Sequence, residues 1–386
     1  MRILQVVPAL EAGGVTKGTL EITAALIAAG AEAHIACDGG AFAAEAARLG
    51  AILHPIPAAK KGLLAYFKCR ARLWAIIKAH SIDIVHARSR FPAWPAHAAA
   101  RGRSVPFVTT YHGSYGGMNW APKRFYNSIM ARGDRVIAIS DFIARYIQQH
   151  HPQCDKKHII NIPRGVDPNK YDINHSIEHN QGLWHKWSVE NHHFLFVLPG
   201  RLTRWKGHTD ALLALALILP EHPEARLLFI GDAQGRSDYM AELRGLAGRL
   251  GVAHAVLFAP PSADMNAVYA AADCVLVPST KPEAFGRVPI EAGAAGRLVI
   301  ASGHGGAAET VRDGVTGLHH VPRDPCSLAH AMHRALSMPP SERQAMGNAA
   351  RQHVITCYTI AQMQQRTLDV YRSLLREPRQ PARENP

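Results

Sequence analysis

Short apolar runs alternate with longer segments of helical period along most of the chain, and this alternation limits the fold more than any other sequence feature. In the first half, the runs with the composition of buried strands are residues 3–7, 32–36, 84–87, 107–111, 135–139 and 159–162. Segments of helical period lie between them, for example residues 16–29 and 63–79. Buried strands that alternate with helices indicate βαβ units, and therefore a parallel sheet covered on both faces.

A second series of such units follows after an interruption. Residues 169–193 are polar, rich in His and Asn and without periodicity, so we predict that they form an interdomain linker. The apolar runs of the second series are residues 194–198, 227–230, 256–258, 274–277 and 298–301. The sequence therefore predicts an α/β protein with two Rossmann-like, doubly wound domains, at residues 1–175 and 190–358, which face each other across a cleft. Because open α/β sheets bind ligands outside the carboxyl ends of their strands, functional residues should directly follow the strands.

Composition agrees with two globular domains and leaves the partner open. The chain has 386 residues, 47% of them hydrophobic, and a single core rarely grows beyond about 250–300 residues. This apolar fraction is too high for a disordered chain. The 43 Lys and Arg residues outnumber the 30 Asp and Glu residues, which gives a net charge of +13. Such a charge suggests an anionic partner, which could be a nucleic acid, a phosphorylated ligand or an anionic membrane surface.

The cysteines and the lengths of the apolar runs narrow the class of protein. The six cysteines are far apart and form no CxxC pair, so we expect small buried side chains of a reducing compartment rather than a zinc or redox motif. No apolar stretch approaches the ~18 residues of a membrane-spanning helix. We therefore expect a protein that is soluble, or at most attached to a membrane surface.

The segment after the run 274–277 carries two carboxylates on either side of a glycine turn. Glu283 lies on the loop, and Glu291 lies on the helix that follows. Gly286 allows a close backbone approach, and the free N–H groups of a helix start form a ready anion site. The two carboxylates could hold sugar hydroxyls at both ends of a diphosphate. The alternative is a capping acid and a solvated glutamate on the helix.

A basic cluster follows the run 194–198. It contains Arg201 and Lys206, which stand between a strand and a helix. Arginine gives forked hydrogen bonds to phosphate oxygens, and lysine adds a compact positive charge. The cluster fits a diphosphate clamp, although a solvated basic loop would have the same composition.

Two weaker signals lie at strand ends of the first domain. Gly13 and Gly14 have the position of a dinucleotide-binding loop but not its GxGxxG spacing, and a tight turn without a ligand explains them equally well. His112 follows the run 107–111 and could donate a hydrogen bond into the cleft, or it could be a structural histidine.

Together these residues resemble the signature of the family 4 retaining glycosyltransferases. Glu283, Phe285-Gly286 and Glu291 look like the family's E-x-F-G-x-x-x-x-E pattern, and Arg201 with Lys206 looks like its phosphate clamp. Further matches are Gly13-Gly14, His112-Gly113, residues 161–167, Gly305-Gly306 with Glu309, Asp313-Gly314 and Gly317. The matches occur in order from residue 1 to about residue 370. Ser302-Gly303-His304 departs from the more common pattern at a loop that could line the donor-sugar pocket.

The resemblance implies a GT-B fold that binds a nucleotide-diphosphate sugar in the interdomain cleft. By that similarity, Glu291 would hold the ribose hydroxyls and Glu283 the hydroxyls of the donor sugar. Arg201 and Lys206 would neutralise the diphosphate as it leaves. Phe285, the backbone N–H groups near Gly286 and Arg287, and the Gly13-Gly14 loop would make further contacts with the donor. His112 would form a hydrogen bond with the donor sugar.

The resemblance also bears on cofactors and on the end of the chain. We expect no cofactor and no metal, since Arg201 and Lys206 would replace the cation that stabilises the leaving group. Retention of the anomeric configuration is usual in the family. A helix at residues 360–376 would pack back on the first domain, although it could also be a terminal helix of the second.

Residues 60–74 combine cations with large apolar side chains at helical spacing. This pattern is typical of a helix that rests on an anionic membrane, but also of an ordinary helix with a buried apolar stripe and solvated basic residues. First domains of the family commonly bind lipid-linked acceptors, and the aromatic stretch 113–132 is the candidate for part of an acceptor site. We expect a cytoplasmic protein, at the inner face of the cytoplasmic membrane if this helix binds lipid.

The sequence thus predicts an enzyme that moves a sugar, of the hexosyltransferase type, from a nucleotide-diphosphate sugar to a glycan or lipid-linked acceptor. Cell-envelope polysaccharide or lipopolysaccharide biosynthesis is the expected setting. One alternative is a nucleotide-sugar epimerase of similar architecture, which would need further catalytic acids. A catalytically inactive scaffold is another. A nucleic-acid-binding module would leave the clamp and the paired glutamates unexplained, so we expect no nucleic acid partner.

Overall fold

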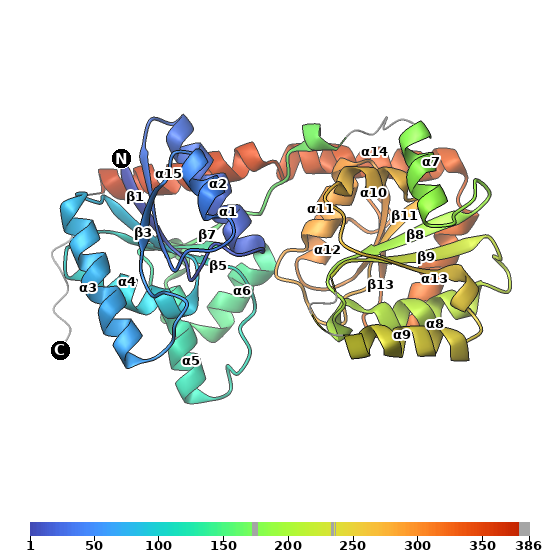
Figure 1. The fold of residues 1–386 in the computed structure, drawn as a ribbon, viewed down its shortest axis with the longest axis horizontal. Coiled ribbons are helices and arrows are strands. Elements are labelled where there is room, and N and C mark those ends of the chain that lie inside the picture. Colours follow the sequence, from blue (N-terminus) through green and yellow to red (C-terminus); the bar gives the residue numbers. More distant parts are fainter. Residues whose placement is uncertain (172–176, 233–234, 236, 378–386) are drawn as a thin grey trace. The chain divides into compact units, whose positions relative to one another are not determined.

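The computed structural model describes residues 1–171, 177–232, 235 and 237–377, which form two α/β units (Figure 1). Unit 1 consists of Met1–Arg164 and of the segment that begins at Ile360, whereas unit 2 consists of Gly165–Thr359. Each unit has its own parallel sheet and its own core. The alternation of apolar runs and helical segments therefore predicts the architecture of both units correctly.

The sheet of unit 1 has seven parallel strands in the order β3-β2-β1-β4-β5-β6-β7. These strands are β1 (Arg2–Val6), β2 (Glu32–Cys37), β3 (Ile52–Pro55), β4 (Ile84–Ala87), β5 (Phe107–Tyr111), β6 (Arg135–Ala138) and β7 (Ile159–Asn161). In the register of the sheet, Ile3 lies opposite Ala33 on one side and opposite Ile84 on the other. The strand order reverses between β1 and β4, and such a switch point is where doubly wound sheets place ligands.

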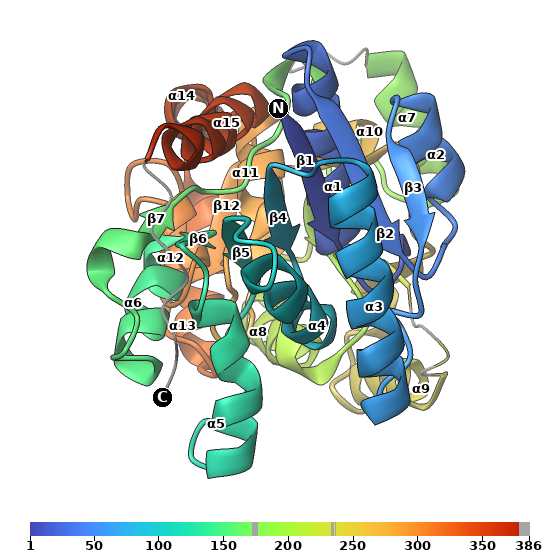
Figure 2. The same ribbon diagram turned by 90° about the vertical axis from the view of Figure 1, so that its left-hand side faces the viewer.

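Helices cover the sheet of unit 1. They are α1 (Gly14–Ala28), α2 (Ala43–Arg48), α3 (Leu63–Ala79), α4 (Arg90–Arg101), α5 (Ala121–Ser128) and α6 (Asp141–His150), with 3-10 turns at Ile129–Ala131 and Lys156–His158. Helices α3 and α4 lie side by side (Figure 2). Helix α15 (Ile360–Arg376) packs against α1, and its buried Tyr371 belongs to the same core as Ile3 and Leu26.

The sheet of unit 2 has six parallel strands in the order β10-β9-β8-β11-β12-β13. They are β8 (Phe194–Pro199), β9 (Ala225–Ile230), β10 (Val256–Ala259), β11 (Cys274–Val277), β12 (Leu298–Ser302) and β13 (Leu318–His320). The α-helices of this unit are α7 (Ile177–Lys186), α8 (His208–Ile218), α9 (Ser237–Arg249), α10 (Met265–Ala271), α11 (Arg287–Ala294), α12 (Ala307–Thr310), α13 (Pro325–Ser337) and α14 (Pro340–Cys357). Its 3-10 turns are Pro168–Lys170, Arg204–Lys206 and Ala253–Ala255.

The predicted linker at residues 169–193 is wrong for the residues that the structure describes. This stretch contains α7, which packs on α10, and the division between the units falls earlier, after Arg164. Trp187 is buried in the core of unit 2, and Trp184 packs against that core and donates its indole N–H to the Ala271 carbonyl oxygen over 3.0 Å. Two large side chains among polar residues thus anchor the segment without producing an apolar period. Residues 172–176 lie outside the described part of the chain.

Two further expectations concern the cysteines and the membrane. The six cysteines are free thiols, and four of them are buried, but Cys326 is exposed and Cys357 is half-buried, so the expectation of buried side chains fails at these two. Among the described residues, none of the helices is both long enough and apolar enough to cross a membrane.

Candidate functional site

Lys206 and Glu283 meet at the carboxyl ends of two adjacent strands of unit 2. Strands β8 and β11 pair in parallel, so the loops that follow them leave the same edge of the sheet. The backbone N–H of Thr280 donates to the Trp205 carbonyl oxygen over 2.8 Å and thereby links the two loops. The Lys206 Nζ atom lies 2.7 Å from Glu283 Oε1, and the two side chains are only 12% and 10% exposed. The lysine of the predicted clamp and the first predicted carboxylate therefore form one cluster.

The loop that carries Glu283 is held by the segment after β12. The backbone N–H of Gly306 donates to the Glu283 carbonyl oxygen over 2.8 Å. A Cβ atom on Gly306 would lie 2.4 Å from the Cα atom of Phe285, so a larger residue would force the two loops apart. Phe285 itself is buried, with its ring 5.7 Å from that of Tyr358. The glycine pair of the family pattern thus fixes the backbone that presents Glu283.

The Glu283 carboxylate is oriented by two donors on one of its oxygens. Ser279 Oγ and Lys206 Nζ both donate to Oε1. His304 Nε2 in turn donates to the Ser279 carbonyl oxygen over 2.8 Å. The other oxygen, Oε2, has no hydrogen bond to another described residue, so it is available to accept one from a ligand hydroxyl. Sequence analysis did not assign Ser279 a role, although it lies two residues after β11, in the segment that carries Glu283 and Glu291.

Glu291 lies on α11, which begins after Gly286. Gly286 has a φ of 79°, in the left-handed region that favours glycine, and the helix starts at Arg287. Tyr269 on α10 donates its hydroxyl to Glu291 Oε2 over 3.0 Å, and Arg287 Nε donates to Oε1 over 3.3 Å. Burial and the nearby Glu291 raise the pKa of Tyr269 well above its ordinary value, so the hydroxyl stays protonated and donates. Glu291 is thus a partly buried acceptor in a fixed orientation.

Tyr269 contacts a predicted site residue, and sequence analysis missed it. It lies within the alanine-rich helix α10, where nothing but helical period marks it. Its ring lies 6.1 Å from that of Tyr171, whose pKa is also raised, first by burial and then by Glu291. The two tyrosines give the carboxylate of Glu291 an aromatic, low-dielectric surrounding.

The two arginines after β8 have different surroundings. Arg201 is exposed, and its side chain forms no ion pair with another described residue. Arg204 lies 2.7 Å from Glu242 and over the ring of Tyr239. Arg201 is therefore the arginine whose guanidinium can bind a phosphate without first breaking an ion pair.

The predicted site residues of unit 1 lie at the start of α1 and after β5. Gly13 precedes α1, and Gly14 is its first residue. The buried Arg164 donates to the Gly14 carbonyl oxygen over 2.8 Å, and its guanidinium lies 3.6 Å from Glu21 Oε2. A Cβ atom on Gly18 would lie 2.2 Å from that guanidinium. Arg164, which sequence analysis noted without a role, therefore positions the glycine loop.

His112 follows β5, and the Nε2 atom of its imidazole ring is buried. Its Nε2 atom has no hydrogen-bond partner among the described residues. Burial, and then the charges of Arg164 and Arg88, hold the pKa of His112 well below its ordinary value. The ring is therefore neutral at pH 7 and can donate or accept one hydrogen bond.

The predicted residues thus form two groups. His112, Gly13 and Gly14 belong to unit 1. Unit 2 holds the other seven, which are Arg201, Lys206, Glu283, Phe285, Gly286, Arg287 and Glu291.

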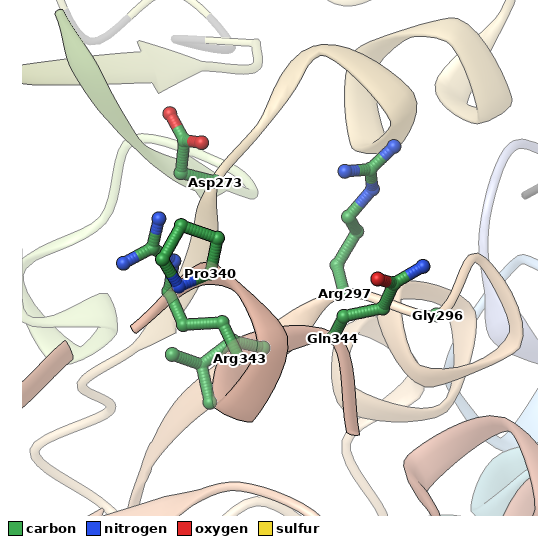
Figure 3. A pocket seen from close by; sticks show the side chains of 7 residues that line it. Asp273, Gly296, Arg297, Pro340, Arg343 and Gln344 are labelled. Carbon is green, nitrogen blue, oxygen red and sulfur yellow. The ribbon is translucent and has the colours of Figure 1, made fainter. Parts of the chain in front are cut away.

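A hollow of about 230 Å³ in unit 2 lies elsewhere (Figure 3). It is lined by Asp273, Arg297 and Arg343, among others. Asp273 precedes β11 and Arg297 precedes β12, so the hollow lies at the amino ends of the strands, whereas the Lys206–Glu283 cluster lies at their carboxyl ends. The hollow is therefore not part of the candidate active site.

Comparison with known proteins identifies the family. The model of the Glycosyltransferase Family 4 matches residues 12–170, and the model of the Glycosyl transferases group 1 matches residues 185–353. A D-inositol 3-phosphate glycosyltransferase of Acidothermus cellulolyticus is 30% identical over 324 residues, which cover 77% of this chain and 68% of that protein. The chain is a family 4 glycosyltransferase. With several other curated relatives, the match spans about half of their length.

Solved structures establish the fold of this family 4 glycosyltransferase. A glycosyltransferase from Rickettsia africae superposes with a TM-score of 0.90 at 31% identity and covers 98% of this chain and 99% of that one. HepE of Anabaena, solved in complex with UDP-glucose, gives a TM-score of 0.83 at 24% identity and covers 97% of this chain and 100% of its own. Together with the two parallel sheets, these neighbours confirm the predicted GT-B fold.

Proposed function

We propose that the protein is a retaining, hexosyltransferase-type enzyme that transfers a sugar from a nucleotide-diphosphate sugar to a glycan or lipid-linked acceptor. The observation that carries the proposal is the arrangement around the start of α11. Glu283, which pairs with Lys206, precedes that helix start. Glu291 lies one turn into the helix and accepts a hydrogen bond from Tyr269 of α10. Two oriented carboxylates, with Lys206 beside one of them and a helix start between them, fit a ligand that has hydroxyls, a diphosphate and hydroxyls in series.

Each part of the donor has a partner in this proposal. Glu291 accepts hydrogen bonds from the ribose hydroxyls, and Glu283 accepts one from the donor sugar through Oε2. Phe285, in the loop between β11 and α11, is a donor contact. The N–H groups at Gly286 and Arg287 bind the diphosphate. In unit 1, the Gly13-Gly14 loop and the neutral His112 offer further hydrogen bonds to the phosphate and the sugar. The UDP-glucose complex of HepE supports a donor of this class.

Lys206 and Arg201 are proposed to stabilise the leaving group. Negative charge grows on the diphosphate as the glycosidic bond breaks, and fixed cations at that point lower the barrier. Because two cationic side chains supply this charge, we propose transfer without a metal ion at the donor site and without another cofactor. We propose retention of the anomeric configuration, which is usual in the family, through front-face attack by the acceptor.

The proposed setting is polysaccharide or lipopolysaccharide biosynthesis of the cell envelope, in the cytoplasm. The matched family models describe glycosyltransferases and favour transfer over the epimerase alternative. Release of the nucleoside diphosphate from a panel of nucleotide sugars, measured with the purified protein, tests the proposal and identifies the donor.

Helix α3 presents large apolar side chains to solvent, which favours the membrane alternative over the ordinary helix. Leu63, Leu64 and Phe67 are 79%, 77% and 58% exposed. The buried face of the helix consists of Ala65, Cys69, Leu73 and Ile77. Lys60, Lys61, Lys68 and Arg70 are exposed beside the apolar residues. Exposed apolar side chains flanked by cations suit a surface of anionic lipid, and we propose that this end of α3 attaches the protein to the cytoplasmic membrane.

The membrane proposal predicts that the protein sediments with vesicles that contain anionic lipid at low salt, and much less at high salt. The triple variant L63S/L64S/F67S should bind at least about tenfold more weakly, since each buried apolar side chain contributes roughly 1.5–3 kcal/mol. Leu217→Ser is the matched control, because Leu217 is 55% exposed but lies on α8 of unit 2. Equal sedimentation of the triple variant and the control would contradict the proposal.

A further inference from the structure

Two histidines and a glutamate form a compact cluster at the amino-terminal edge of the unit 2 sheet. His222 Nε2 lies 2.9 Å from His333 Nδ1, and His333 Nδ1 lies 3.7 Å from Glu221 Oε2. One ligand atom of each of the three residues lies within 4.8 Å of the other two. Around a tetrahedral Zn²⁺ ion, with bonds of about 2.0–2.2 Å, neighbouring ligand atoms are about 3.3 Å apart. The two observed separations, 2.9 Å and 3.7 Å, lie on either side of this ligand–ligand distance.

The second nitrogen of His222 has the partner that a metal-binding histidine usually has. Glu224 Oε1 lies 3.1 Å from His222 Nδ1 and accepts a hydrogen bond from it. This hydrogen bond leaves the lone pair of His222 on Nε2, where it accepts a hydrogen bond from His333 Nδ1 over 2.9 Å, and a metal ion would replace that hydrogen bond. A carboxylate behind a ligating imidazole fixes its tautomer and increases its basicity. His333 Nε2 lies 3.5 Å from Ser337 Oγ.

The backbone that presents these side chains is rigid. Glu221, His222 and Glu224 lie in the short turn between α8 and β9, with Pro220 before it and Pro223 within it. His333 lies on α13, which packs along α8 (Figure 1). Ile218 at the end of α8 and Met332 beside His333 are buried in the same core. Since proline fixes φ and the two helices share a core, the backbone positions of these residues are well defined, while the side chains of His333 and Glu221 are 46% and 76% exposed and open to a ligand.

We propose that His222, His333 and Glu221 bind a divalent transition-metal ion, with Zn²⁺ as the best match, and that water completes the coordination. Imidazole nitrogens select Zn²⁺ and its neighbours over Mg²⁺ and Ca²⁺, which prefer oxygen ligands. The site lies at the amino ends of the strands, because Glu224 directly precedes β9. The Lys206–Glu283 cluster lies at the carboxyl ends, so this ion takes no part in sugar transfer. It joins the α8–β9 turn to α13 and stabilises the folded unit 2 by binding it.

In the test, the 386-residue protein is stripped with EDTA and titrated with ZnCl₂. Calorimetry measures binding, and the shift of the unfolding midpoint measures stabilisation. The visible absorption of bound Co²⁺ reports imidazole coordination independently. We expect the wild type to bind one more ion than His333→Ala or His222→Ala. We also expect the wild type to unfold at a higher temperature with Zn²⁺ than without it. Glu224→Gln should weaken binding about 10–100-fold.

The matched control is His254→Ala, because His254 is an exposed histidine of the same unit outside the cluster. It should bind Zn²⁺ like the wild type, and circular dichroism of all variants should show the wild-type fold. The proposal is overturned if His333→Ala and His222→Ala bind Zn²⁺ with the stoichiometry and affinity of His254→Ala, or if the wild type shows no saturable binding.

Discussion

Replacing Lys206 with alanine should lower the rate of sugar transfer by about 10²–10³-fold and weaken binding of the nucleoside diphosphate. The side chain is the partly buried cation of the cluster, 2.7 Å from Glu283 and 12% exposed. A fixed donor aimed at developing negative charge typically contributes a factor of this size. The measurements are kcat with the identified donor and acceptor, and the Kd of the nucleoside diphosphate by calorimetry.

Arg204→Ala is the matched control for the lysine variant. Arg204 lies two residues earlier in the same loop but forms its ion pair with Glu242. It should keep a rate close to that of the wild type, whereas Arg201→Ala should resemble Lys206→Ala. The unfolding midpoint of each variant must be compared as well, because loss of Lys206 leaves the mostly buried Glu283 without its cation. If Lys206→Ala is folded and has wild-type turnover, the assignment of Lys206 to the diphosphate clamp is wrong.

Replacing Glu283 with glutamine should lower kcat by at least about tenfold while the nucleoside diphosphate binds nearly as well as before. The amide keeps the size of the side chain but loses the negative charge that pairs with Lys206 and receives the sugar hydroxyl. A hydrogen bond to a charged group contributes about 1.5–3 kcal/mol, which corresponds to roughly 10–150-fold. The expected loss lies in kcat because Glu283 is proposed to contact the donor sugar and not the nucleotide.

Glu291→Gln should give the opposite pattern, and the pair of variants tests the two assignments together. Glu291 is held by Tyr269 and Arg287, and it is proposed to bind the ribose. Its amide variant should bind the nucleoside diphosphate about tenfold more weakly. If Glu283→Gln instead loses the nucleotide and Glu291→Gln retains it, the roles of the two carboxylates are reversed.

The sequence predicts the sheets of both units and the residues of the unit 2 cluster because those features are local. A buried strand is a short apolar run, and the loop after it carries its chemistry in consecutive residues, as at Ser279 to Glu291. Two edge strands have no such run and were not predicted: the residues of β3 are at least partly exposed, and β13 has only three residues, two of them histidines. Helix α7 is hidden in the same way, because Trp184 and Trp187 anchor it without an apolar stripe.

The supporting residues of the site escape sequence analysis for a different reason. Tyr269 reaches Glu291 from 22 positions earlier in the chain, and Arg164 reaches Gly14 from 150 positions later. Neither contact produces a recognisable pattern in the sequence around the residues that form it. The same holds for the metal cluster, where His222 and His333 are 111 residues apart.

Release of the nucleoside diphosphate from nucleotide sugars, in buffer with EDTA, tests the central claim most directly. The purified wild-type protein should turn over one donor, faster when a suitable acceptor is present, and an equal concentration of Lys206→Ala should release almost none. Restoration of a lost rate by Mg²⁺ or Mn²⁺ would contradict metal-free transfer. If no nucleotide sugar is bound or turned over, or if Lys206→Ala releases the product as fast as the wild type, the proposed donor site is wrong.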